Sequence, residues 1–206
     1  LLHQSGFTAE EVSFENYRKH ISEMETDSVW ALMKQDIQEY GVQETYKSPS
    51  VVESVDWKRI YSVLDGSGCG LCIQIIPTLL SDDERRLIAK NTAHCSQAVD
   101  GVVPNMRDSL AAASADRWKY YAQKVANPFA EVNLIVIGTV TSAALVTARI
   151  KQSVHGTAFR TIAVSAYQKY SIYNQPWKIS HELKKSDAAS LRKWTSDEIS
   201  QIFLLS

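Results

Sequence analysis

The sequence predicts an α+β fold, and three features of its pattern indicate this class. Residues 51–78 and residues 131–166 each follow the order strand, helix, strand. A helical stretch, about residues 81–127, separates these two units, and an amphipathic helical pattern precedes them. This order predicts a split βαβ, ferredoxin-like sheet with an N-terminal helical hairpin and a helical insertion between the two βαβ halves.

The composition is that of a globular protein. The chain has 206 residues, of which 45% are hydrophobic and 22% are charged. Its longest apolar runs, at 71–80 and 134–137, are well short of the roughly 20 residues that a membrane span needs. The chain begins without methionine and without a signal peptide, so we expect a soluble fragment of a longer protein. Three cysteines are too few and odd in number for a disulfide framework, which favours a reducing, cytoplasmic location.

Charge is distributed unevenly along the chain, although the net charge is only −1. Acidic residues outnumber basic ones by 11 to 6 in residues 1–60, and basic residues outnumber acidic ones by 9 to 4 in residues 141–206. The middle block, residues 61–140, is nearly balanced at 8 to 7. The acidic N-terminal part and the basic C-terminal part can attract each other, within one chain or between two copies of it. The basic part can also attract an acidic partner.

The first predicted domain, residues 1–48, is a helical arm. Thr8 and Glu11 form a capping box that starts one helix, and Asp27 can cap a second helix that ends at Gly41. The second helix carries one apolar stripe: Trp30, Met33, Ile37 and Tyr40. This stripe either packs on the main domain or forms a partner-binding face.

The second predicted domain, residues 49–179, contains both βαβ units and the insertion at about 81–127. Its elements are expected at 51–55, 57–64, 69–78, 81–97, 116–126, 131–138, 141–154 and 158–166. Ser81 and Glu84 form a capping box at the start of the element at 81–97. Residues 180–206 are predicted to be a linker and the start of a following element, because Thr195 and Glu198 form a capping box close to the end of the chain.

The motifs that resemble catalytic or cofactor sites do not fit their chemistry. Gly138, which follows an apolar strand, lacks the lysine and further glycines of a phosphate-binding loop. Gly66, Gly68 and Gly70 follow a helix and precede a strand, which indicates a turn. Cys69 and Cys72 lie at the start of a strand, where residues i and i+3 point to opposite faces, and Cys95 lies on a predicted helix. We therefore predict no catalytic residue, no cofactor and no metal ligand.

An aromatic and basic segment follows the last predicted strand. Flat rings can stack on bases while amines contact phosphates, so this segment is a candidate contact for nucleic acid or for a protein partner. Aromatic residues that leave a sheet edge also commonly cover a core, and that alternative stays open. The residues concerned are Tyr167, Lys169, Tyr170, Tyr173, Trp177 and Lys178.

The final segment, residues 191–204, reads LRKWTSDEISQIFL and resembles the segment that precedes the motor domain in HerA-like and VirB-type conjugative ATPases. The unit Asp56–Tyr61 followed by Cys69–Pro77 is similar in style to the N-terminal region of that family. Ser206 stands where the family has a proline, and the chain holds no Walker A or Walker B motif. The resemblance implies a non-catalytic N-terminal region that assembles or docks around a DNA- or protein-translocating ATPase.

Three functions are consistent with the sequence. The first is a non-enzymatic interaction and assembly domain with a protein partner or self-association. The alternatives are a small enzyme with a pocket between the sheet and the inserted helices, and a nucleic-acid-binding module that uses the basic C-terminal third.

Overall fold

The fold is built on an antiparallel sheet. The computed structural model describes residues 11–13, 15, 16, 19, 28–40, 45–99, 109–163 and 191–203. The main sheet contains β1 (Ser28–Gln35), β5 (Gly70–Thr78), β6 (Phe129–Gly138), β8 (Ala158–Ala163) and β9 (Trp194–Thr195). Two short pairs stand outside it: β2 (Ile37–Tyr40) with β3 (Thr45–Ser48), and β4 (Ser54–Val55) with β7 (Val154–His155). The class is therefore α+β, as the sequence predicts.

The strand order of the main sheet is β5-β6-β1-β8, and every neighbouring pair is antiparallel. The strands β1 and β5, which both lie next to β6, are therefore parallel to each other, and the same holds for β6 and β8 on either side of β1. The short strand β9 pairs with β6 at Phe129 and Ala130, beyond the stretch of β6 that pairs with β1.

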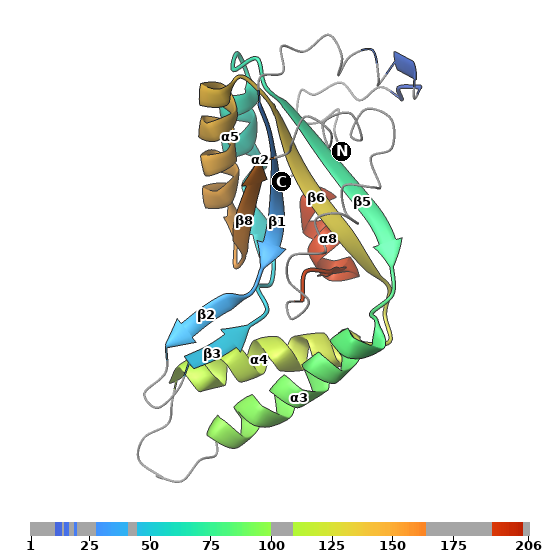
Figure 1. The fold of residues 1–206 in the computed structure, drawn as a ribbon, viewed down its shortest axis with the longest axis vertical. Helices are drawn as coiled ribbons and strands as arrows, with labels where there is room; N and C mark the ends of the chain where they lie inside the picture. Colours follow the sequence, from blue (N-terminus) through green and yellow to red (C-terminus); the bar gives the residue numbers. More distant parts are fainter. Residues whose placement is uncertain are drawn as a thin grey trace.

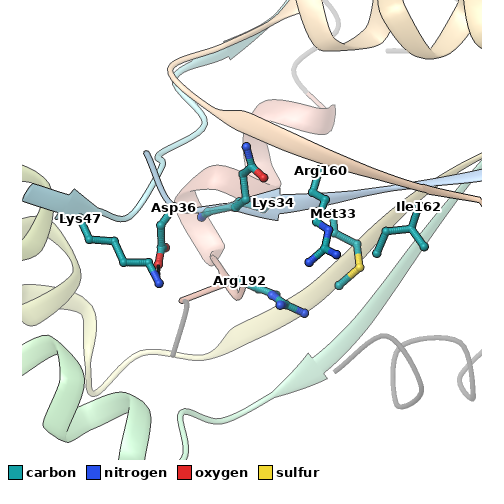
Figure 2. A pocket seen from close by; sticks show the side chains of 8 residues that line it. Met33, Lys34, Asp36, Lys47, Arg160, Ile162 and Arg192 are labelled. Carbon is teal, nitrogen blue, oxygen red and sulfur yellow. Dashed lines mark ion pairs between the residues drawn. The ribbon is translucent and has the colours of Figure 1, made fainter. Parts of the chain in front are cut away.

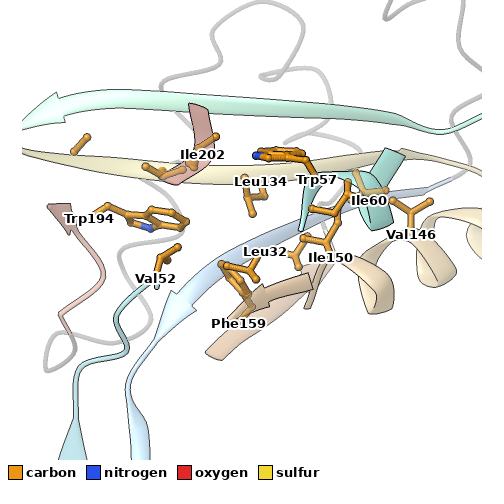
Figure 3. Packing of buried hydrophobic residues seen from close by; sticks show 14 of the residues in the cluster. Leu32, Val52, Trp57, Ile60, Leu134, Val146, Ile150, Phe159, Trp194 and Ile202 are labelled. Atoms are coloured by element: carbon orange, nitrogen blue, oxygen red, sulfur yellow. The ribbon is translucent and has the colours of Figure 1, made fainter. Parts of the chain in front are cut away.

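One face of this sheet is covered by helices α2 (Trp57–Leu64), α5 (Val140–Ser153) and α8 (Ser196–Phe203). Figure 1 shows how these helices are arranged around the strands. Alternate residues of β6 point to this face, and they are small or aliphatic along its whole length. The resulting core is drawn in Figure 3 and includes Leu32, Trp57, Ile60, Leu134, Val146, Ile150, Phe159, Trp194 and Ile202.

A second core lies at one end of the sheet. Helices α3 (Asp82–Val99) and α4 (Ser109–Lys124) form an antiparallel pair against the β2–β3 hairpin (Figure 1). Its buried side chains come from the hairpin, from both helices, from the start of β6 and from the C-terminal segment: Tyr46, Ile88, Cys95, Trp118, Tyr121, Phe129 and Leu191. These two helices lie within the range 81–127 where helices were predicted, and they connect β5 to β6.

Two of the predicted capping boxes are confirmed. At the start of α3, Ser81 N–H donates to Glu84 Oε2 over 2.7 Å while Glu84 N–H donates to Ser81 Oγ over 3.3 Å. At the start of α8, Thr195 N–H donates to Glu198 Oε2 over 2.9 Å and Glu198 N–H donates to Thr195 Oγ1 over 3.2 Å. The box predicted at Thr8 lies outside the described residues.

The predicted second helix of the N-terminal arm is wrong. Residues 28–40 form the two strands β1 and β2, and β1 lies between β6 and β8 in the main sheet. The apolar residues of β1 are buried on both faces of the strand, and their spacing also fits the apolar stripe of a helix. Residues 51–55 are consequently not the first strand of the main sheet, since only Ser54 and Val55 are extended and they pair with β7.

The prediction that residues 180–206 form a linker and a new element is wrong for residues 191–203. Leu191, Trp194 and Glu198 are at most 1% exposed, and Trp194 packs on Phe159 of β8 with 6.3 Å between the ring centroids. This C-terminal segment is therefore part of the same folded body as β1. Among the described helices, none has the length and apolar composition needed to cross a bilayer.

Gly138 ends β6 beside Cys69, and this contact explains the glycine. A Cβ at residue 138 would lie 2.5 Å from Cys69 Sγ. We predict that Gly138→Ala lowers the free energy of unfolding by about 1–3 kcal/mol, because an overpacked atom must push the thiol aside. Urea denaturation measures this change.

The matched control is Gly138→Ala in a Cys69→Ala background, where the clashing sulfur is absent. The cost of Gly138→Ala should then fall to less than half. Equal costs in the two backgrounds would contradict a steric role for Cys69.

Candidate functional site

A pocket of about 110 Å³ lies where β1 ends and β2 begins. Its walls come from β1, β3, β8 and the C-terminal segment, which are far apart in the sequence but adjacent in the fold (Figure 2). The lining residues are Met33, Lys34, Gln35, Asp36, Lys47, Arg160, Ile162 and Arg192. We call this site the cationic pocket.

The carboxylate of the cationic pocket belongs to Asp36, the single residue between β1 and β2. Its side chain is only 3% exposed, and Oδ2 lies 3.5 Å from Lys47 Nζ of β3. Burial raises the pKa of Asp36 to about 6, while Lys47 and the main chain of Leu191 favour the charged form. The acid is therefore held in a poorly solvated position next to a half-exposed amine.

Two guanidinium groups form another wall of the pocket. Arg160 projects from the middle of β8 on the same sheet face as Met33, with which it is paired in register. Arg192 comes from the C-terminal segment, and Figure 2 shows both side chains directed toward the space beside Met33 and Ile162. Among the described residues that line the pocket, Lys47, Arg160 and Arg192 provide three cationic groups beside the carboxylate of Asp36.

A buried ionic cluster lies behind this pocket. Lys34 and Glu198 have fully buried side chains and form an ion pair with 2.6 Å between Nζ and Oε1. Lys34 Nζ also donates to Tyr121 Oη and, over 3.3 Å, to the carbonyl oxygen of Lys193. Nζ lies 5.0 Å from the ring centroid of Tyr121 and 5.7 Å from that of Trp194, so aromatic faces complete its surroundings.

Glu198 is the acceptor that joins the cluster to the main chain. Its Oε1 accepts from Val52 N–H over 2.9 Å, and its Oε2 accepts from Tyr121 O–H over 2.8 Å and from Thr195 N–H over 2.9 Å. Burial lowers the pKa of Lys34, and Glu198 opposes that shift. Burial together with the charge of Glu198 raises the pKa of Tyr121 well above its ordinary value. Each charged group of the cluster therefore has hydrogen-bond partners and an opposite charge beside it.

Further contacts attach the same C-terminal segment to the helical insertion. Lys193 Nζ lies 2.6 Å from Glu84 Oε2 of α3 and donates over 2.6 Å to the carbonyl oxygen of Leu79. Lys124 of α4 pairs with Asp197 at 2.5 Å. Residues 191–198 thus connect the first strand, the insertion and α8 through charged contacts.

The residues predicted as a partner face do not share one face. Trp30 points to the helix-covered side of the sheet, whereas Met33 points to the other side and lines the cationic pocket. Ile37 and Tyr40 lie on the separate hairpin, where Tyr40 is 72% exposed. The predicted stripe is therefore corrected to one core residue, one pocket residue and two hairpin residues.

The aromatic and basic candidates all lie outside the described residues. They are Tyr167, Lys169, Tyr170, Tyr173, Trp177 and Lys178. Their assignment as a nucleic-acid or partner contact stays a prediction.

The cysteines lie apart from one another in the fold. Cys69 packs against the helix-covered core, Cys72 points to the opposite sheet face, and Cys95 is buried in the α3–α4 core with Sγ 3.4 Å from Ser114 Oγ. Within the described ranges, no three His, Cys, Asp or Glu side chains gather as they would around a metal ion.

Comparisons with models of protein families, with curated proteins and with solved structures give no match for this chain. The class that the fold and the site define is an α+β domain with a cationic surface pocket.

Sequence reasoning missed this pocket because its charged groups are far apart along the chain. Arg160 and Arg192 belong to the basic C-terminal third, whose charge surplus was the available signal. Lys34 and Asp36 were not recognised, because residues 28–40 were interpreted as a helix and not as two strands.

Loss of the Lys34 charge should destabilise the fold strongly. We predict that Lys34→Met lowers the free energy of unfolding by about 3–5 kcal/mol, because Glu198 stays buried without its counter-charge. Chemical denaturation followed by circular dichroism measures the change. In the double variant Lys34→Met with Glu198→Gln, neither of these two positions carries a charge, and part of the loss should be recovered. A double variant less stable than Lys34→Met would contradict the charge argument.

Asp36 should make stability depend on pH. Its folded-state pKa of about 6 lies above the ordinary 3.8, so its stabilising effect is fully present below about pH 4 and is lost as the pH rises through 6. We predict that Asp36→Asn raises the free energy of unfolding at pH 7 by at most about 3 kcal/mol and flattens its slope between pH 4 and pH 6. Asp116→Asn, at an exposed position of α4, is the control and should leave that slope unchanged.

Proposed function

We propose that this chain is a non-catalytic protein-interaction and assembly domain whose cationic pocket receives an acidic segment of a protein partner. The observation that carries this proposal is the convergence of Lys47, Arg160 and Arg192 on one pocket, in which Asp36 is the one acidic residue among the described lining residues. Side chains of like charge repel each other, and an anionic group between them removes that repulsion. The pocket volume of about 110 Å³ suits a group the size of a carboxylate.

The hydrogen bonding around the pocket supports binding more than chemistry. Lys34, Tyr121 and Asp36 are groups near the pocket that could transfer protons. Lys34 and Tyr121 hydrogen-bond to Glu198 and to main-chain oxygens. The carboxylate of Asp36 forms an ion pair with Lys47 at 3.5 Å. A general acid or base must lie within hydrogen-bonding distance of the substrate atom to which it transfers a proton. The groups that face the pocket opening, by contrast, are guanidinium groups, which remain charged at all physiological pH values and bind carboxylates in pairs of hydrogen bonds.

We further propose that the main sheet is a variant of the ferredoxin-like plan. The order β5-β6-β1-β8 with α2 after β1 and α5 after β6 is consistent with two interleaved βαβ units. In this interpretation the β2–β3 hairpin and β4 are inserted between β1 and α2, and α3–α4 between β5 and β6.

The link to a translocating ATPase rests on the resemblance of residues 191–204 and stays part of the proposal. In such a protein, this domain would precede the motor and would supply contacts rather than hydrolysis. The firm attachment of residues 191–198 to β1 and α4 is compatible with a domain that holds a fixed orientation to whatever follows it.

Binding of an acidic probe tests the proposal. We expect a fluorescein-labelled octaglutamate peptide to bind in 50 mM salt and to bind about tenfold more weakly to the variant with Arg160→Glu and Arg192→Glu, because two attractive charges become repulsive. Fluorescence anisotropy measures the affinity, and thermal unfolding checks that the variant is folded.

The matched control reverses Lys58 and Lys151, which are exposed on α2 and α5, away from the pocket. It has the same net charge as the pocket variant and should bind like the wild type. An equal loss in both variants, or no binding by the wild type, would overturn the pocket as the partner site. Tighter, pocket-dependent binding of single-stranded oligothymidylate of equal charge would favour the nucleic-acid alternative instead.

A further inference from the structure

We propose that β5 is the self-association edge of this domain: two copies pair their β5 strands antiparallel, centred on Ile73, and join their sheets into one. This inference rests on the proposed function in that it names a second copy of the chain as one partner of the assembly domain. It concerns a different surface from the cationic pocket, so the two can fail separately.

The strand β5 stands at one end of the main sheet. All nine of its residues pair with β6, and of the strands that the structure describes only β6 pairs with it (Figure 1). Edge strands of natural proteins commonly carry charges that discourage further pairing. The opposite edge, β8, has Arg160 in its middle, whereas β5 has no charged residue between Gly70 and Thr78.

Pro77 indicates which main-chain groups of β5 face outward. Proline has no N–H, so inside a paired strand its nitrogen lies on the side away from the neighbouring strand. The N–H and C=O groups of a strand alternate between its two sides from residue to residue. Leu71, Ile73 and Ile75 therefore direct their N–H and C=O groups away from β6. In the described part of the chain, these groups have no hydrogen-bond partner.

The side chains of β5 are symmetric about Ile73. In an antiparallel pair centred there, Ile73 lies opposite Ile73 of the second copy, and Leu71 lies opposite Ile75. All three side chains point to the helix-covered face and are packed against its core while still partly exposed. The pairing would extend that apolar layer across the junction. It would also let the three outward-facing residues of each copy form six hydrogen bonds between them.

Pro77 also favours this register over the one centred on Gln74. A pair centred on Ile73 uses residues 70–76 and leaves Pro77 outside. A pair centred on Gln74 would instead place Pro77 opposite Leu71 and would lose a hydrogen bond there. A strand-to-strand junction alone buries less area than a stable dimer needs, so we expect association to depend on concentration.

Disulfide formation tests the register directly. In a background with Cys69→Ala and Cys72→Ala, Ile73→Cys should form a covalent dimer on mild oxidation, because directly opposite residues have Cα atoms about 5.5 Å apart. The matched control is Leu71→Cys in the same background. Two copies of residue 71 would lie about 13 Å apart along the strands, too far for a disulfide, and the variant should remain uncrosslinked. Cys95 is 2% exposed and can stay in both.

Mass in solution tests the association itself. Light scattering of the wild type should give a mass that rises from 23.1 kDa toward twice that value with increasing concentration. Ile75→Pro keeps the pairing with β6, because its nitrogen faces outward, but it removes a donor of the dimer and should stay monomeric.

Three results would overturn the inference: a constant mass of 23.1 kDa, no crosslink through residue 73, or equal crosslinking through residue 71. The variant with Arg160→Glu and Arg192→Glu should still form the dimer. Loss of octaglutamate binding with an intact dimer would therefore leave the dimer proposal standing. Intact peptide binding without a dimer would contradict only the proposal that β5 is the self-association edge.

Discussion

The ion pair between Lys34 and Glu198 is the contact on which the arrangement of the domain depends. Lys34 lies on β1 in the centre of the main sheet, and Glu198 lies on α8, 164 residues further along the chain. The pair is fully buried, so neither group can exchange its partner for water without opening the core. Two buried charges are stable only with further hydrogen bonds. Tyr121 and Val52 provide them from two other segments, and Thr195 provides one from the start of α8. The C-terminal segment is thereby fixed against β1 and α4.

The same ion pair explains where the cationic pocket lies. The side chain of Lys34 points to the helix-covered face, and the next residues, Gln35 and Asp36, end the strand at the rim of that core. Arg192 is six residues before Glu198, so the anchoring of Glu198 brings Arg192 next to Asp36 and Arg160. A surface site made from residues 36, 47, 160 and 192 thus depends on a buried contact that none of those residues makes.

Sequence patterns predicted the elements whose signals are local. The capping boxes at Ser81 and Thr195 were recognised because their donors and acceptors are three residues apart. The helices α2, α3 and α5 and the strands β5, β6 and β8 were predicted close to their observed bounds. The first strand was misassigned because the apolar pattern of β1 depends on neighbours on both faces, which no local window contains. The pocket and the ion pair join residues more than 100 positions apart, and charge pattern alone does not show such pairs.

The two edges of the sheet differ in a way that relates the proposed surfaces to each other. The edge at β8 carries Arg160 and faces the cationic pocket, so positive charge both discourages pairing with another strand and attracts an acidic group there. The edge at β5 is free of charge, and its proline leaves one uninterrupted run of seven residues for pairing. Because the two edges are separated by the width of the sheet, pairing through β5 would leave both copies of the pocket accessible. A dimer of this kind would present two cationic pockets to an acidic partner, and two linked sites bind a partner with matching spacing more tightly than one.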